Sequence, residues 1–291
     1  MNSLDRERWK SQVLDEIFVA IASSETLSRI LVFKGARVLN LQLKTARQSL
    51  DIDSNLTRDF VRCHPDRLEQ RAILEREFDR AIRRHFERQE PVQFELAKVT
   101  VKPNPRNLHP RGWDAFDVTI QVKDLSRNVG YLPRLELDVA APEELREAAI
   151  GSIQVGQHHV LAYTLQRIAG EKLRAFLSTL PSYRNKVSKP GEAVRAKDLY
   201  DISQIFRVYG MEQLEFWRAV GQEFRVACQS RYIDCLGLTT FQEQWEVTRQ
   251  TYQQATIPRD VPFDEAEVTL QAIVELFEED KVIPFVFPLP D

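Results

Sequence analysis

The 291-residue chain has little of what marks several large classes of protein. Its three cysteines, at positions 63, 228 and 235, form no CxxC pair, which excludes a zinc ribbon and argues against a disulfide framework. Ten glycines and 14 prolines are too few for a low-complexity chain. No apolar run approaches the roughly 20 residues of a membrane span, and the first ten residues contain no signal-peptide core. We therefore expect a reduced, cytoplasmic protein with no membrane partner.

An excess of charge of one sign is also absent. Forty basic residues stand against 43 acidic ones, so the formal net charge is −3. Any contact with nucleic acid would have to come from a local patch. Two basic stretches are candidates, one on a charged helix and one in a proline-bounded segment: Arg80, Arg83, Arg84 and Arg88, and then Arg184, Lys186, Lys189, Arg195 and Lys197. A solvated charged surface is the alternative interpretation of both.

Familiar catalytic signatures are missing too. The motifs GxGxxG, GxxxxGK[ST], HExxH and GxSxG do not occur. The five histidines have no ligand-like spacing with the cysteines. The adjacent pair His158 and His159 would point in opposite directions on an extended chain, which makes a poor metal site. Candidate chemistry therefore has to come from other side chains.

Periodicity divides the chain near residue 155. Before this point, strands are predicted at 92–102, 115–122 and 133–140, a short strand at 49–56 and a helix at 66–89. After it, the pattern is helical, with helices predicted at 164–179, 195–209, 211–230, 240–255 and 264–279. Strands without intervening helices favour an antiparallel or mixed sheet. The predicted fold class is α+β, with a domain at 1–155 that contains a small mixed or antiparallel sheet and a helical domain at 156–291.

Acidic residues alternate with apolar ones in two of these strands. Asp51 and Asp53 are two residues apart, so on a strand both carboxylates share one face. An exposed acidic strand edge is the ordinary explanation of such a pair. In a second segment, Leu135–Val139, Glu136 and Asp138 also share a face. If the two strands are neighbours, Asp51 and Asp53 converge with Asp138 or Glu136, and the oxygen ligands suit Mg²⁺ in a phosphoryl or nucleotidyl transfer centre.

Four segments resemble motifs of one family. Residues 33–39, FKGARVL, and 47–53, RQSLDID, resemble the first motif of the AbiEii/AbiGii toxin family of DNA polymerase β-like nucleotidyltransferases, approximately FKGGTxL and then RFSxDxD. Residues 171–175, EKLRA, and 195–201, RAKDLYD, resemble two later motifs of that family. The motifs occur in the family's order over roughly residues 10–210. The resemblance implies a polymerase β-like nucleotidyltransferase domain.

The resemblance also implies roles for individual residues. Asp51, Asp53 and Asp138 match the metal-binding carboxylates, Lys172 matches a lysine that faces the triphosphate, and Asp198 and Asp201 match acids of the last motif. The implied catalytic residues are Asp51, Asp53, Asp138, Lys172 and Asp198. The implied nucleotide-binding residues are Lys34, Gly35, Ala36, Arg37, Arg47, Ser49 and Lys172. Ala36 and Arg37 depart from the family pattern, which has glycine and then threonine or serine; Arg37 would either pair with a phosphate or block the site.

The implied activity is a transfer of nucleotides. In this interpretation two Mg²⁺ ions are held by the acids, an NTP is the substrate, and the acceptor is RNA, with the 3′ end of tRNA as the expected target. The setting would be a toxin–antitoxin or phage-defence system, with an antitoxin protein as a further partner. Two alternatives remain open. One is a catalytically weak relative that acts as a binding component of a defence complex, and the other is a transferase that modifies a protein hydroxyl.

Overall fold

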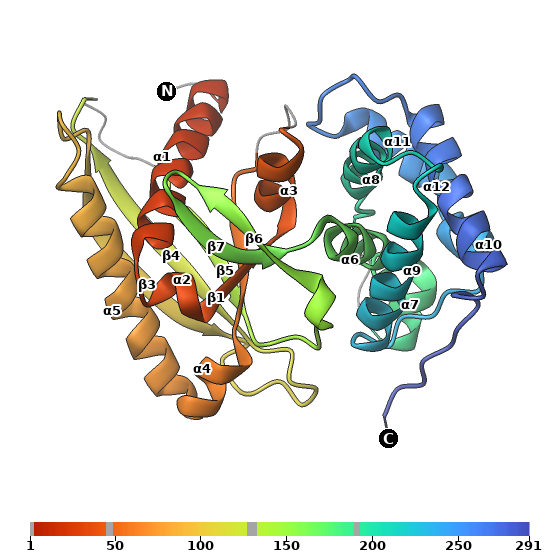
Figure 1. Ribbon diagram of the computed structural model, residues 1–291, viewed down its shortest axis with the longest axis horizontal. Coiled ribbons are helices and arrows are strands. Elements are labelled where there is room, and N and C mark those ends of the chain that lie inside the picture. Colours follow the sequence, from red (N-terminus) through yellow and green to blue (C-terminus); the bar gives the residue numbers. More distant parts are fainter. Residues whose placement is uncertain (1–2, 45–48, 127–132, 189–192, 291) are drawn as a thin grey trace. The chain divides into compact units, whose positions relative to one another are not determined.

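The computed structural model describes residues 3–44, 49–126, 133–188 and 193–290. The chain forms two compact units (Figure 1). The first comprises Met1–Leu41, Gln48–Glu143 and Ile150–Tyr163, and the second comprises Gln42–Arg47, Glu144–Ala149 and Thr164–Asp291. Residues 158–163, which the periodicity placed in the helical part, form a strand of the first unit.

A seven-stranded mixed sheet forms the centre of the first unit, in the order β3-β4-β5-β2-β1-β7-β6. The pairs β2/β5 and β1/β7 are parallel, and the other neighbouring pairs are antiparallel. The strands are β1 (Leu31–Lys34), β2 (Ile52–Leu56), β3 (Phe94–Asn104), β4 (Ala115–Asp124), β5 (Leu135–Ala140), β6 (Ile150–Val155) and β7 (His158–Tyr163). The predicted α+β fold with a mixed sheet is confirmed.

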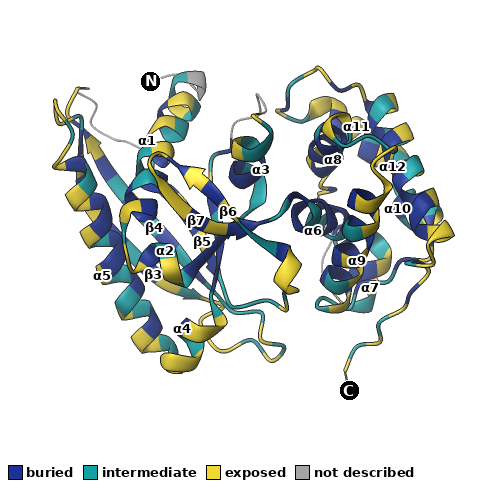
Figure 2. Ribbon diagram, in the orientation of Figure 1, coloured by how far each residue is buried: buried dark blue, intermediate teal, exposed yellow. Residues whose placement is uncertain are grey.

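One face of this sheet is apolar, because buried residues alternate along its strands (Figure 2). In β5, Leu135, Leu137 and Val139 are buried, whereas the residues between them are exposed. Helix α1 packs on this apolar face, with the ring of Phe18 4.7 Å from that of Phe33 on β1. The opposite face is polar and carries the acidic residues of β2 and β5.

Within the described residues, five helices belong wholly or mainly to the first unit. They are α1 (Ser3–Ser23), α2 (Leu27–Ile30), α3 (Gly35–Leu43), α4 (Arg58–Cys63) and α5 (Arg67–Phe86). Helix α5 begins after Asp66, whose side chain accepts a hydrogen bond from the backbone N–H of Leu68. The ring of Phe86 at its end packs 5.6 Å from that of Phe94 on β3. Helices α1 and α5 thereby close the apolar core.

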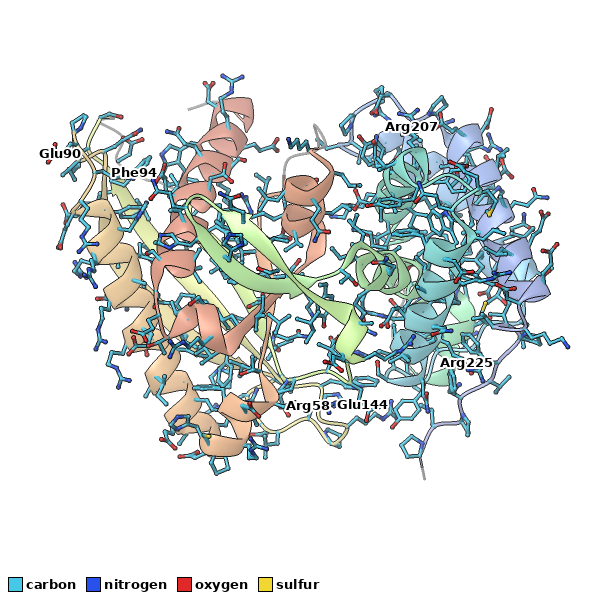
Figure 3. The ribbon with its side chains drawn as sticks, viewed as in Figure 1. Arg58, Glu90, Phe94, Glu144, Arg207 and Arg225 are labelled. Atoms are coloured by element: carbon cyan, nitrogen blue, oxygen red, sulfur yellow. The ribbon has the colours of Figure 1, made fainter. Side chains whose placement is uncertain are left out.

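The second unit is helical. A 3₁₀ turn, η1 (Glu147–Ala149), precedes its helices α6 (Leu165–Leu177), α7 (Pro181–Lys186), α8 (Lys197–Val208), α9 (Leu214–Gln229), α10 (Leu238–Phe241), α11 (Trp245–Gln254) and α12 (Phe263–Glu279). The single helix predicted at 240–255 is wrong, since α10 and α11 are separate. Arg207 of α8, which is labelled in Figure 3, pairs with Asp260 and with Glu265 of α12.

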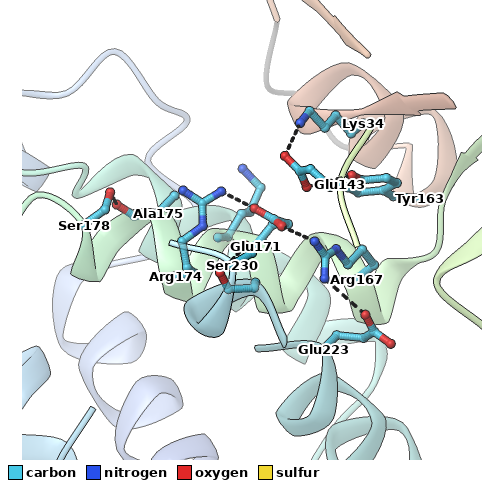
Figure 4. A network of polar contacts seen from close by, with 12 residues as sticks. Lys34, Glu143, Tyr163, Arg167, Glu171, Arg174, Ala175, Ser178, Glu223 and Ser230 are labelled. Atoms are coloured by element: carbon cyan, nitrogen blue, oxygen red, sulfur yellow. Dashed lines mark hydrogen bonds and ion pairs between the residues drawn. The ribbon is translucent and has the colours of Figure 1, made fainter. Parts of the chain in front are cut away.

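Helices α6 and α9 are joined by close packing and by buried charge. A Cβ at Gly170 of α6 would overlap the backbone of Phe224 in α9, so the glycine permits this approach. Arg167 is fully buried and pairs with Glu171 at 2.5 Å and Glu223 at 3.4 Å (Figure 4). Because each buried charge has a partner, the network ties the two helices together.

Within the described ranges, no helix combines the length and apolar character that a membrane crossing requires.

Candidate active site

The centre of the polar sheet face carries a line of charged residues across four adjacent strands. Lys34 of β1 is the register partner of Asp53 of β2, which is the partner of Asp138 of β5, which is the partner of Asp117 of β4. Direct cross-strand partners point to the same side of a sheet. Lys34, Asp53, Asp138 and Asp117 therefore form one line, here termed the charged row.

Successive side chains of β2 point to opposite faces of the sheet, and this determines the face on which Asp53 lies. Ile52 and Ser54 are buried on one side of the strand, and Asp53 between them is half-buried on the other. Asp51 immediately precedes β2 and is exposed. The hydroxyl of Ser49 donates to Asp51 Oδ1 at 2.6 Å, which fixes the orientation of the Asp51 carboxylate.

The charged row concentrates negative charge around Asp138. Partial burial of its carboxyl group raises the pKa of Asp138, the charges of Asp117, Asp51 and Glu136 raise it further, and Lys34 opposes them. Like charges that face one another on adjacent strands are unfavourable unless something neutralises them. Asp51 therefore acts electrostatically on Asp138, although it lies outside the charged row. A cation would relieve this repulsion.

The donor set fits a hard divalent cation in part. Within the described part of the chain, no three histidine, cysteine or acidic side chains gather into a compact metal-binding group. The predicted triad Asp51, Asp53 and Asp138 is thus not a closed cage; its most direct relationship is the register pair Asp53 and Asp138. Mg²⁺ commonly takes only one or two carboxylates and completes its octahedron with phosphate oxygens and water. Such an open donor set suits Mg²⁺ bound together with a phosphate ligand.

Gly35 joins β1 to α3 directly beside this pair. Its φ of +81° is in the region that favours glycine. A Cβ at this position would also overlap Asp53 Oδ2, so no larger residue fits without moving that carboxylate. The turn brings the first backbone N–H groups of α3 to the end of the strand that carries Lys34. Ala36, which follows, is half-exposed.

Lys34 is held by a polar network within the first unit. Its Nζ donates to Glu143 at 3.0 Å, and the hydroxyl of Tyr163 donates to the same carboxylate at 3.0 Å (Figure 4). The amide of Asn55, which is fully buried, donates to the Tyr163 hydroxyl. Lys34 is therefore a partly exposed cation of fixed position at the end of the charged row.

Arg37 is directed into the protein. It is 6% exposed, and its donors reach the carbonyl of Asp51 at 3.2 Å, the carbonyl of Ser49 at 2.5 Å and the carboxylate of Asp15. Of the two expectations for this residue, pairing with a phosphate and blocking the site, neither matches the position of its side chain. Arg47, also predicted to bind the nucleotide, lies outside the described residues.

Lys172 and Asp198 meet inside the second unit. Lys172, on α6, is 7% exposed and pairs with Asp198 at 3.2 Å and with Asp201, both on α8. Arg195 Nε donates to Asp198 at 2.6 Å. Burial alone would raise the pKa of the Asp198 carboxyl, but Lys172 and Arg195 outweigh it and lower the pKa to about 2. Lys172, Asp198 and Asp201 are buried, whereas Arg195 is exposed, and the two positive charges balance the two negative ones.

Several residues of the two basic stretches pair with acids of the protein. On α5, Arg80 pairs with Glu77 and Arg83 with Asp79. A groove of about 720 Å³ beside α5 is lined by arginines but also by three acids, and by no residue of the charged row. In the second stretch, Lys186 Nζ bonds to Asp234 at 2.6 Å, and Lys189 lies outside the described residues. Among the described residues of the two stretches, these acids interrupt the basic surface.

Sequence reasoning missed several residues around this site. Asp117 lies between Phe116 and Val118, the same hydrophobic–acid–hydrophobic pattern that singled out Asp138, so its signal was present. Glu143 and Tyr163 had no such signal, because their approach to Lys34 depends on a loop and on a strand that was not predicted. Their positions follow only from the tertiary structure.

The fold is that of a nucleotidyltransferase. A Helicobacter pylori protein proposed to be a nucleotidyltransferase is similar in structure, with a TM-score of 0.53 and 13% identity, covering 98% of this chain and 100% of that one. The Helicobacter pylori protein JHP933 is similar with a TM-score of 0.52 and 14% identity, covering 95% of this chain and 92% of that one. At these identities the likeness describes the fold alone. No curated protein matches the chain significantly.

The profile of the nucleotidyl transferase AbiEii toxin family, of type IV toxin–antitoxin systems, matches residues 17–276. The chain belongs to this family. It is a nucleotidyltransferase enzyme of the toxin type, and the predicted family is confirmed.

Proposed function

We propose that the chain is a Mg²⁺-dependent enzyme that transfers nucleotides from an NTP to RNA, with the 3′ end of tRNA as acceptor, in the cytoplasm. The observation that supports this proposal most is the register pairing of Asp53 with Asp138 at the turn that begins α3. Two carboxylates beside a helix N-terminus provide, in one place, ligands for a divalent cation and donors for phosphate.

Asp53 and Asp138 would hold the metal, and Asp51, oriented by Ser49, would supply a further carboxylate. When bound, Mg²⁺ polarises phosphate oxygens and lowers the pKa of a coordinated hydroxyl. A cation bound there would relieve the repulsion around Asp138, whose carboxyl pKa is raised by burial and by the charges of Asp117, Asp51 and Glu136. Their function is to fix the position of the metal and of the attacking hydroxyl.

The triphosphate would lie at the N-terminus of α3. The backbone N–H groups of Gly35 and Ala36 are free of helical partners by position, as at any helix start, and favour an anion there. Lys34 would contribute positive charge from the adjoining strand, held in place by Glu143. In the resembled family, a hydroxyl side chain stands where this chain has Arg37, so backbone donors and Lys34 would carry more of the phosphate binding here.

Lys172 and Asp198 keep their roles as a prediction from the family resemblance. Within the second unit, the lysine already has two carboxylate partners, Asp198 and Asp201. A direct phosphate contact by Lys172 would require that it exchange one of these carboxylates for the phosphate. The ion-pair cluster gives both residues a structural function in addition.

The biological setting follows from the family. A type IV toxin–antitoxin assignment supports a toxin whose activity is opposed by an antitoxin, and RNA is the acceptor that we propose for it. In the described part of the two basic stretches, the acids that pair with Arg80, Arg83 and Lys186 leave RNA no extended basic surface. The acceptor would then be bound mainly through the part of it that enters the active site.

The test is incubation of the purified chain with each labelled NTP, Mg²⁺ and total RNA. We expect label in RNA, sensitive to ribonuclease and resistant to protease, and abolished in Asp53→Asn. The matched control is Glu136→Gln, which removes an exposed acid from the same sheet face outside the charged row. Label in protein would instead indicate protein modification. No transfer by the native chain, or equal transfer by Asp53→Asn, contradicts the proposal.

A further inference from the structure

Arg37 occupies a position that the nucleotide-binding prediction does not explain. Arg37 is 6% exposed although it lies in the first turn of α3, close to the proposed phosphate site. A phosphate-binding arginine needs donors that reach solvent. The donors of Arg37 instead reach Asp15 and the two carbonyls of Ser49 and Asp51.

These two carbonyls flank the segment that leads into β2. The Nε of Arg37 holds the carbonyl of Asp51, and one terminal nitrogen holds that of Ser49. Ser49 in turn donates its hydroxyl to the Asp51 carboxylate at 2.6 Å. One planar side chain thus fixes the backbone on both sides of Leu50, and through Ser49 it also fixes the carboxylate of Asp51.

A carboxylate outside the proposed active site, that of Asp15, stabilises the positive charge of Arg37. Burial lowers the pKa of its guanidinium, whereas Asp15 and Asp51 raise it. Asp15 lies on α1, and its side chain is 67% exposed, so this end of the contact faces solvent. Arginine suits such a position because its planar fork offers several donors in fixed directions, which the single ammonium group of lysine does not.

We infer that Arg37 is a positioning residue, which holds residues 49–51 so that the Asp51 carboxylate keeps its position directly before β2, the strand that carries Asp53. This inference rests on the proposed function only for its catalytic consequence. Residues that orient metal ligands typically change metal affinity by about 10–100-fold when they are removed. Arg37 therefore acts through Asp51, and it makes no contact with the triphosphate.

The experiment compares the native chain with the variants Arg37→Lys and Asp15→Asn. The matched control is Arg62→Lys, because Arg62 is a surface arginine of the same unit and is paired with Asp59. Hydrogen exchange followed by mass spectrometry monitors a peptide that covers residues 49–56 and a second one that covers β4. Label transfer is measured over a range of Mg²⁺ and NTP concentrations. The thermal unfolding midpoint reports overall stability.

For Arg37→Lys we expect faster exchange in residues 49–56 with β4 unchanged. The Mg²⁺ concentration for half-maximal transfer should rise about 10-fold or more, with the KM for NTP at saturating Mg²⁺ unchanged. Asp15→Asn should give a smaller effect in the same direction, and Arg62→Lys none. Uniform or unchanged exchange, or a raised KM for NTP with unchanged Mg²⁺ dependence, overturns the inference. If the native chain transfers nothing, the proposed function fails, and the exchange measurement alone decides whether Arg37 holds this segment.

Discussion

Asp53 of β2 and Asp138 of β5 are direct partners in a parallel register, although they come from distant stretches of the chain. The pairing puts both carboxylates on the polar face of the sheet, beside the turn between β1 and α3. Like charges placed in this way weaken a sheet. Their retention at the start of a helix is understandable if they bind a cation that accompanies a phosphate.

Replacement of Gly35 by alanine should impair both stability and transfer. A residue with a Cβ at φ +81° costs roughly 1–2 kcal/mol, and its Cβ would also push against Asp53 Oδ2. We expect nucleotide transfer to fall about 100-fold because the carboxylate moves. The control is Gly112→Ala, where φ is +68° but no atom lies within 4 Å of the added Cβ. It should lose similar stability and keep its activity. Equal activity of both variants would contradict the close fit of Gly35 and Asp53.

Asp198 should make the second unit sensitive to acid. Its pKa is lowered from 3.8 to about 2, so the folded state favours the ionised carboxylate. The resulting stabilisation is fully present above about pH 4 and is lost as the pH falls from about 4 to 2. Asp198→Asn should therefore lower the unfolding midpoint markedly at pH 6 and less at pH 3, where roughly half of this stabilisation remains. Asp59→Asn, on an exposed side chain, is the control and should change little at either pH. A difference for Asp198→Asn that does not depend on pH would show that Lys172 and Arg195 do not stabilise its charge.

Gly170→Ala should loosen the contact between α6 and α9. Alanine is the better helix former by about 1 kcal/mol, but its Cβ would overlap the backbone of Phe224, which has no flexible end that can give way. Overpacking of this kind costs roughly 1–3 kcal/mol or more, so the variant should unfold at a lower temperature. In Gly210→Ala, the added Cβ meets only the flexible side chain of Glu212, and the midpoint should stay near that of the native chain. An unchanged midpoint for Gly170→Ala would show that the helices separate easily.

The α+β class, the helical second part and the strands that carry Asp53 and Asp138 could be predicted from the sequence. The alternation of acidic with apolar residues can be recognised from a few neighbouring positions. In the structure, the acidic and the apolar residues of these strands do lie on opposite faces of the sheet. Strand β1 was not predicted, because its four residues run directly into α3. Strands β6 and β7 were not predicted either, and because of them the sheet includes residues up to 163. Short strands give too few alternations for a reliable pattern.

The surroundings of the candidate site were less accessible to sequence reasoning. The pairing of β2 with β5 is a long-range choice that no local pattern specifies. The inward direction of Arg37 depends on Asp15, on a different helix, and on two backbone carbonyls. The burial of Lys172 depends on carboxylates of α8. In each case the sequence shows the type of the residue, but it does not show which distant residue that side chain contacts.

The central claim is that Asp53 and Asp138 together bind the divalent cation that the transfer requires. The most direct measurement is the binding of Mn²⁺, as a spectroscopic substitute for Mg²⁺, with a non-hydrolysable NTP analogue, followed by electron paramagnetic resonance. The native chain and Glu136→Gln should bind Mn²⁺ in the presence of the analogue, whereas Asp53→Asn and Asp138→Asn should each bind it at least about 10-fold more weakly. Equal Mn²⁺ binding by all four proteins would contradict the account.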